Sequence, residues 1–214
     1  MKRWLGGVSS LKSALSRPLP RGTAEEILLK DKILETLEQR SVHRCANELG
    51  KAILYSRALK GLESADSFHS IDFFRLASWA LFDQLFAHAI KVLDPREKAG
   101  FAFLCDRYRD SVSEFCQHEG LELADIVSVA LGLKLLRDKT HFHLDPVGVR
   151  DPDAIWSAAS ITQDQLDNVL QISFQVVCFL HELIRGQKFD LPNYDGTDAK
   201  RAAETAYQDR FSRY

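Results

Sequence analysis

The stretch RDKTHFHLDP, residues 137–146, holds a guanidinium group, two imidazoles and two carboxylates within ten residues. Arginine keeps its charge near neutral pH and its planar fork of donors fits phosphate oxygens, whereas histidine can gain or lose a proton there. Arg137 and His143 could therefore bind a phosphodiester, neutralise charge that develops on its oxygens, and move a proton to or from a hydroxyl. This combination suits metal-free RNA cleavage, in which the ribose 2′-hydroxyl attacks the adjacent phosphate.

Helical geometry limits which histidine can act with Arg137. At about 100° per residue, Arg137 and His141 share a face, whereas Arg137 and His143 point about 120° apart if the helix stays regular. His143 can join Arg137 only where the helix is distorted or has ended. Pro146 favours an ending, because proline clashes with the preceding turn and disfavours helix in the residue before it.

Two other interpretations of this stretch stay open. Arg137 can simply pair with a carboxylate on a neighbouring helix, while a histidine stabilises the negative end of the helix dipole, and neither arrangement needs a function. Alternatively, His141, His143 and Asp145 could bind a metal ion, because alternate residues of an extended segment face one way. A helix end does not favour such a site and no other cluster supplies ligands, so we expect no metal ion and no cofactor.

The elements that must position this stretch are predicted to be helices, which makes the chain all-α. Apolar residues recur at spacings of three and four from Ala24 onward, glycine is scarce, and no alternating pattern bounded by turns appears. Cap signals and apolar runs predict five main helices. The first covers about 24–62, the second begins at Asp66 and Ser67, and the third begins at Asp94 and Pro95 and runs to about His118, before Gly120. The fourth runs from near Leu121 to the motif, and the fifth from Thr162 to Gly186. A turn around Trp156 and a short helix over about 199–210 are also expected.

Side-chain patterns within these segments predict the core. In the first segment we expect Leu37, Leu49 and Ile53 to be buried. Trp79 and the phenylalanines near it form an aromatic-rich helix, which we assign to the core or to a dimer interface rather than to base stacking. The four cysteines show no Cys-x-x-Cys pair and lie in apolar or helical patterns, so we expect reduced thiols of a cytoplasmic protein.

Composition and charge divide the 214 residues into three parts. The expected parts are a basic N-terminal arm or tail (1–24), a helical bundle (25–186) and a polar C-terminal tail (187–214); the arm would also suit an organellar transit peptide. With 28 basic and 30 acidic side chains the net charge is −2, so a polyanion would need a local basic patch. No segment has the roughly 20 consecutive apolar residues of a membrane-spanning helix.

The motif and the segments around it resemble the HEPN superfamily, named for higher eukaryote and prokaryote nucleotide-binding domains. Arg137 and Asp138 followed by His143 form its arginine–polar–x4–histidine signature at the end of an apolar helix. The segment RLASWALFDQLFAHAIKVLDP (75–95), and RDKTHFHLDP with a later Trp156, look most like the phage abortive-infection branch. The resemblance spans about residues 59–183.

The resemblance implies a helical bundle that dimerises and places the motif of one subunit opposite its copy. It further implies a metal-independent endoribonuclease that acts on single-stranded RNA, often as a toxin with an antitoxin partner or as a phage-defence effector. A non-catalytic HEPN-like interaction or nucleotide-binding module is the alternative.

Site residues follow from the same resemblance. Arg137 would hold the scissile phosphate, His143 would act as general acid or base, and Asp138 would orient one of them. His141 has no required place in the family pattern, but its face makes it a helper. Lys139 and Arg150 would add to a basic patch that binds substrate. Some members carry a tyrosine, modified by a partner nucleotidyltransferase, where this chain has Asp145, which puts such regulation in doubt.

Overall fold

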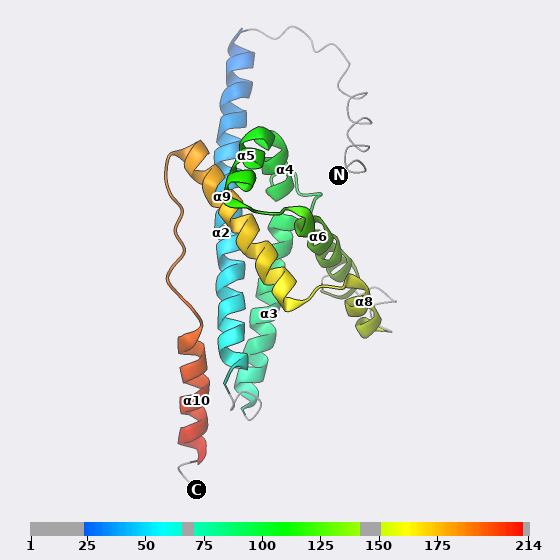
Figure 1. Ribbon diagram of the computed structural model, residues 1–214, viewed down its shortest axis with the longest axis vertical. Coiled ribbons are helices and arrows are strands. Elements are labelled where there is room, and N and C mark those ends of the chain that lie inside the picture. Colours follow the sequence, from blue (N-terminus) through cyan, green and yellow to red (C-terminus); the bar gives the residue numbers. More distant parts are fainter. Residues whose placement is uncertain (1–23, 66–70, 142–150, 212–214) are drawn as a thin grey trace. The chain divides into compact units, whose positions relative to one another are not determined.

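The computed structural model describes residues 24–65, 71–141 and 151–211, with side chains from Leu37 onward except those of Thr140, His141, Pro152 and Phe211, and these residues contain helices and no strand (Figure 1). The all-α prediction is therefore confirmed for the described residues. The α-helices are α2 (Ala24–Glu63), α3 (Asp72–Leu93), α4 (Phe101–Arg107), α5 (Arg109–Glu119), α6 (Ala124–Leu136), α8 (Pro152–Ala159), α9 (Gln163–Arg185) and α10 (Thr197–Phe211). The chain divides into two units, Met1–Thr36 and Leu37–Tyr214, and the contacts below all lie within the second. None of the described helices is long and apolar enough to cross a membrane.

Helix α2 is a single helix of 40 residues, and α3 and α9 both run antiparallel to its second half. Glu48 of α2 contacts His88 of α3, and Leu62, near the end of α2, packs with Phe74 near the start of α3. On the other side, His43 and Ser56 of α2 contact His181 and Asp167 of α9, respectively. These pairings place the α2 segment from residue 43 to 62 between two long partners.

The buried stripe of α2 includes Leu49 and Ile53, as predicted, but not Leu37, which is exposed. Counting about 100° per residue, Leu37 lies on the opposite side of the helix from Val42 and Leu49. The core-facing position in that turn belongs to Glu38, which is 7% exposed. Its carboxylate accepts hydrogen bonds from Arg107 and Tyr108 at the junction of α4 and α5, so the buried charge is satisfied.

The aromatic residues of α3 divide between the core and the surface. Phe86 is buried, and its ring lies 5.4 Å from that of Trp156 in α8. Phe82 also packs against Trp156, with ring centroids 5.6 Å apart. Phe73 and Trp79 are exposed, so the aromatic-rich helix is only partly core.

The predicted start of the third helix is wrong. Asp94 does not open a helix: its backbone N–H donates to the carbonyl of Ile90, which makes Asp94 the C-cap of α3. Its carboxylate turns back to accept the backbone N–H of Arg96, and a turn separates this residue from α4, which begins at Phe101. The local chemistry of an Asp-Pro pair suits either end of a helix. Here the carboxylate of Asp94 accepts hydrogen bonds from the side chains of Arg96 and Arg137.

Other predicted boundaries agree closely with the structure. Gly120 and Gly186 end α5 and α9 in the left-handed conformation, and Thr162 and Gln165 form the predicted capping box of α9. Helix α6 begins at Ala124, a few residues after the expected start. Asp66 and Ser67 lie outside the described residues.

The C-terminal residues pack against α2. A Cβ atom on Gly61 would lie 2.1 Å from the carbonyl oxygen of Gly196, so the two backbones touch there. Ala203 of α10 is fully buried in a small cluster with Leu62 and Phe74. The segment predicted as a polar tail therefore contributes an apolar contact to the fold.

Candidate functional site

Arg137 lies where α6 changes its helical geometry. The α-helix ends at Leu136, and Arg137–His141 form a π-helical turn. A π turn pairs residues five apart rather than four, so it rotates the following side chains relative to an α-helix and often occurs at functional sites. The helix is therefore distorted from Arg137 to His141, and the convergence of Arg137 with His143 stays a prediction. Outside the described residues lie His143, Asp145, Pro146, Arg150 and the side chain of His141.

The guanidinium group of Arg137 is held by two carboxylates. Its Nε and Nη2 donate to Oδ1 of Asp138, at 2.9 and 2.7 Å, and its Nη1 donates to Oδ2 of Asp94. The side chain of Arg137 is 19% exposed. The predicted pairing with a carboxylate on a neighbouring helix is thus present, because Asp94 caps α3.

Asp94 holds a second arginine in the same way. Its side chain is 2% exposed, and it accepts hydrogen bonds from the backbone N–H, Nε and Nη2 of Arg96 at 3.0, 3.3 and 3.2 Å. Arg96 also lies 3.5 Å from Asp138, measured from Nη2 to Oδ1. Two arginines and two aspartates therefore form a closed network in which the formal charges cancel.

The network keeps Arg137 charged. Burial by itself would lower the pKa of the guanidinium, but the hydrogen bond to Asp138 and the charge of Asp94 outweigh it and raise the pKa above its ordinary value. Arg137 can therefore bind and stabilise an anion but cannot act as a base. Any proton transfer at this site needs another group.

The residues predicted from the sequence are only partly brought together. Asp138 contacts Arg137 as expected, and Lys139 lies half-buried on the same π turn. Asp94 and Arg96 were not predicted as site residues. The one signal in the sequence was a second cluster of charge, Asp94-Pro95-Arg96, also placed directly after an apolar helix.

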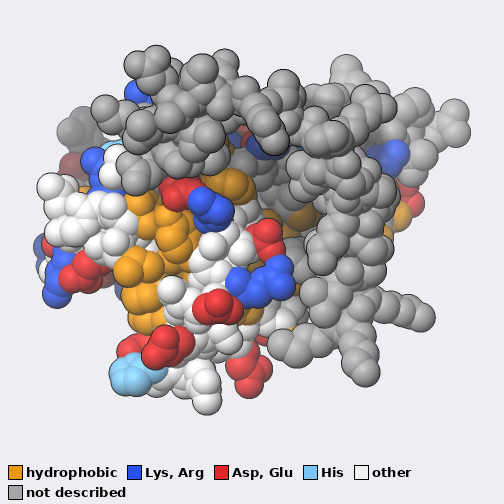
Figure 2. Space-filling view, turned by 90° about the horizontal axis from the view of Figure 1, so that it is seen from above, with side chains coloured by type: hydrophobic (Ala, Val, Ile, Leu, Met, Phe, Trp, Pro, Cys, Tyr) orange, Lys and Arg blue, Asp and Glu red, His pale blue; other side chains and the backbone are white. Residues whose placement is uncertain are grey.

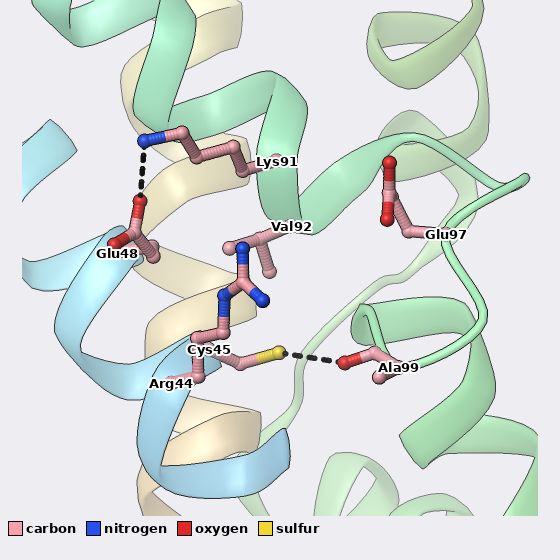
Figure 3. Close-up of a pocket in the computed structure, with 7 residues that line it drawn as sticks. All are labelled: Arg44, Cys45, Glu48, Lys91, Val92, Glu97 and Ala99. Carbon is pink, nitrogen blue, oxygen red and sulfur yellow. Dashed lines mark hydrogen bonds and ion pairs between the residues drawn. The ribbon is translucent and has the colours of Figure 1, made fainter. Parts of the chain in front are cut away.

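A small cavity lies between α2 and the residues from the end of α3 to Ala99 (Figure 3). Its volume is about 30 Å³, which is enough for about one water molecule and far too small for a nucleotide. Glu48 binds Lys91 across it at 3.2 Å, and the Cys45 thiol lies 3.5 Å from the carbonyl oxygen of Ala99. This cavity is a gap between charged side chains and not a substrate pocket.

Burial raises the pKa of all four cysteine thiols, including Cys116. Burial raises the pKa of Cys45 and Cys105 to about 12 and that of Cys178 to about 11, so all three are protonated near neutral pH. Among the described residues no group of three histidine, cysteine or acidic side chains could hold a metal ion. The proposed metal ligands His141, His143 and Asp145 fall outside that search.

Charge on the visible surface is mixed. On the face drawn in Figure 2, acidic and basic side chains of the described residues are interspersed around hydrophobic ones. Comparisons with protein-family models, curated proteins and solved structures found no match to this chain. Among the described residues, the network of two arginines and two aspartates is the feature that points to a function.

Proposed function

We propose that this protein is a HEPN-like endoribonuclease that cleaves single-stranded RNA without a metal ion. In this proposal Arg137 binds the scissile phosphate, His143 is the general acid or base, and Asp138 orients Arg137 before substrate binds. The observation that carries the proposal is the position of Arg137. It is permanently charged, partly exposed, and fixed at a distorted helix end by a buried carboxylate on another helix.

The chemistry of this site supports phosphate binding. A guanidinium group presents its donors in one plane, and a phosphate offers two oxygens to match them. Three of the Arg137 nitrogens are engaged by carboxylates, which hold the fork in one orientation at little further entropic cost. Lys139 and Arg150 remain the proposed additional substrate contacts, and His141 the proposed helper.

A homodimer belongs to the same proposal. Val127 and Leu131 are exposed apolar residues on α6, one helical turn apart, and Leu131 precedes Asp138 by about two turns. A partner subunit that covered these side chains would lie beside the motif. Two facing motifs would give a fuller active site than one, and a role as a toxin or phage-defence effector, with or without an antitoxin, follows from the resemblance.

A non-catalytic binding module is the second candidate, and one specific observation favours it. The guanidinium of Arg137 is paired with carboxylates rather than left open for a ligand. Such a network can stabilise the junction of α3 and α6 without any reaction.

Cleavage of single-stranded RNA in excess chelator tests the enzyme against the module. The wild type should cleave, whereas Arg137→Ala and His143→Ala should each reduce the rate at least a hundredfold. This is typical for loss of a charge-stabilising donor, as in Arg137→Ala, and for loss of a general acid or base, as in His143→Ala. Arg109→Ala and His118→Ala, in exposed positions of α5, are the matched controls and should cleave normally. Thermal unfolding of each variant establishes that it is folded.

Three results would change the assignment. No cleavage by concentrated wild type would favour the module. Activity that chelation removes would revive the metal site. A larger effect of His141→Ala than of His143→Ala would transfer the proton-transfer role to His141, the histidine that shares the face of Arg137 in a regular helix.

A further inference from the structure

We infer that Arg96 and Arg137 together bind one phosphate group, in the position that the carboxylate of Asp138 occupies in this structure. Asp94 is the positioning residue that holds both guanidinium groups. The choice of RNA as the source of the phosphate rests on the proposed function, but the two-arginine site itself rests on the contacts around Asp94 and Asp138.

One buried carboxylate fixes both arginines. Asp94 is 2% exposed, and its oxygens accept bonds from Nη1 of Arg137 and from Nε and Nη2 of Arg96. The backbone N–H of Arg96 also binds this carboxylate, at 3.0 Å, so the chain itself is tied to the site. The two guanidinium groups are therefore set side by side even though Arg96 is 53% exposed.

The position of a single oxygen atom of Asp138 also favours a phosphate site. Oδ1 of Asp138 accepts hydrogen bonds from Nε and Nη2 of Arg137, at 2.9 and 2.7 Å, and lies 3.5 Å from Nη2 of Arg96. One anionic oxygen thus faces both guanidinium groups at once. A phosphate oxygen has the same charge type and accepts the same donors, so it can take this position.

The charge balance of the two arginines and Asp94 favours one further anion. Arg96 and Arg137 carry two positive charges, and Asp94 cancels one of them, so one negative charge is needed to complete the network. Asp138 supplies it in this structure, and one phosphodiester carries the same charge. Asp138 is 34% exposed and can turn toward water, whereas Asp94 cannot leave its buried place without breaking its bonds to both arginines and leaving the largely buried charge of Arg137 without its partner. Asp138 is therefore the carboxylate that a phosphate displaces.

Binding of an RNA analogue that cannot be cleaved tests this site without reference to catalysis. The probe is a fluorescein-labelled single-stranded oligonucleotide with 2′-O-methyl riboses, which lacks the attacking hydroxyl, and its anisotropy is measured with the full-length protein at several salt concentrations. Arg96→Gln and Arg137→Gln should each weaken binding about tenfold. Each should also reduce the slope of log K against log salt by about 0.7, the value for one lost phosphate contact on a single strand.

Two further variants complete the experiment. Arg109→Gln is the matched control, because Arg109 is 57% exposed and pairs with one aspartate, Asp106, and it should leave affinity and slope unchanged. Asp138→Asn removes the competing charge and should tighten binding at least threefold. Competition with AMP then distinguishes the two sources of the phosphate. If the site binds RNA, the labelled probe resists displacement by AMP; if the site binds a free nucleotide, AMP displaces the probe. The two-arginine site stands in both cases.

The inference is overturned if Arg96→Gln binds like Arg109→Gln, if Asp138→Asn does not bind more tightly, or if the wild type does not bind the probe. Cleavage that depends on Arg137 and His143 but not on Arg96 would sink this inference while the proposed function survives. Binding that depends on both arginines in a protein that never cleaves RNA would support the site and reject the enzyme.

Discussion

The carboxylate of Asp94 accepts a hydrogen bond from Nη1 of Arg137, 43 residues later in the chain. Asp94 ends α3 and Arg137 begins the π turn that follows α6, so this bond joins the C-terminal ends of two helices. Both helix ends carry partial negative charge, which the guanidinium groups of Arg137 and Arg96 offset. The bond between Asp94 and Arg137 ties the two helix ends together, and in our proposal it also sets the position of the phosphate ligand.

Removal of the Asp94 charge should destabilise the protein. In Asp94→Asn the neutral amide keeps the size of the side chain but leaves Arg96 and Arg137 without the buried anion that they share, so that Asp138 alone pairs with them. Hydrogen bonds to charged groups contribute about 1.5–3 kcal/mol, so the free energy of unfolding should fall by about 2 kcal/mol in urea titrations. Asp106→Asn, at an exposed ion pair with Arg109, should cost less than about 0.5 kcal/mol. Equal losses in the two variants would contradict the network.

Because the backbones of α2 and the start of α10 are in contact, substitution of Gly61 should destabilise the protein. Helix propensity alone predicts that Gly61→Ala stabilises α2 by about 0.5–1 kcal/mol. The added Cβ would lie 2.1 Å from the carbonyl oxygen of Gly196, however, and backbone cannot move aside as a side chain can. We expect a net loss of about 2 kcal/mol in the free energy of unfolding.

Gly50→Ala is the control for this prediction. Gly50 lies in the same helix, but the atom closest to its new Cβ would be a terminal methyl of Leu191 at 2.5 Å, which can rotate away, and the next atoms, in Leu191 and Phe174, are at an ordinary contact distance of 3.8 Å. Gly50→Ala should therefore be close to neutral by thermal unfolding. A Gly61→Ala protein as stable as the wild type would mean that residues 196–211 do not pack on α2 as described.

Glu48 should make stability depend on pH in the acid range. Burial would raise the pKa of its carboxyl, but hydrogen bonds from His88 and Lys91 outweigh this effect and hold the pKa below its ordinary value of 4.5. A carboxyl with a lowered folded-state pKa stabilises the fold above the unfolded value, and this stabilisation is lost as pH falls through the folded value. Urea unfolding between about pH 3 and pH 7 should show this loss for the wild type and a flatter profile for Glu48→Gln. The exposed Glu114→Gln should leave the profile unchanged, and a steep acid limb retained in Glu48→Gln would reject the assignment.

The buried carboxylate of Glu38 should make the Tyr108 hydroxyl important for stability. This hydroxyl donates to Glu38 at 2.6 Å where α4 gives way to α5. Tyr108→Phe removes one bond to a buried charge while Arg107 still pairs with it, so we expect a loss of about 1–2 kcal/mol in chemical unfolding. Tyr55→Phe, which retains the ring stacked on His88, should lose less. A larger loss of unfolding free energy in Tyr55→Phe than in Tyr108→Phe would contradict this prediction.

Local patterns predicted the helices well where one signal dominated. The Thr162 and Gln165 capping box and the stops at Gly120 and Gly186 depend on chemistry within a few residues, and all appear as expected. The pattern failed at Asp94, whose chemistry serves a helix start and a helix end equally. It also failed at Leu37 and Glu38, because a glutamate on the buried face of α2 indicates a solvent-facing position unless its partners are known.

The candidate site shows the same division. From residue types and spacing alone, the sequence placed Arg137 at the end of an apolar helix, and it required the helix to be distorted or to end before His143 for the two residues to act together. The structure has a π turn starting at that residue. The sequence could not identify Asp94 and Arg96 as partners of the Arg137 site. The packing of α3 against α6 brings together residues about forty positions apart, and short-range periodicity carries no information about such contacts. Long-range packing decides whether a charged side chain faces solvent or another charge, and only the tertiary structure shows that packing.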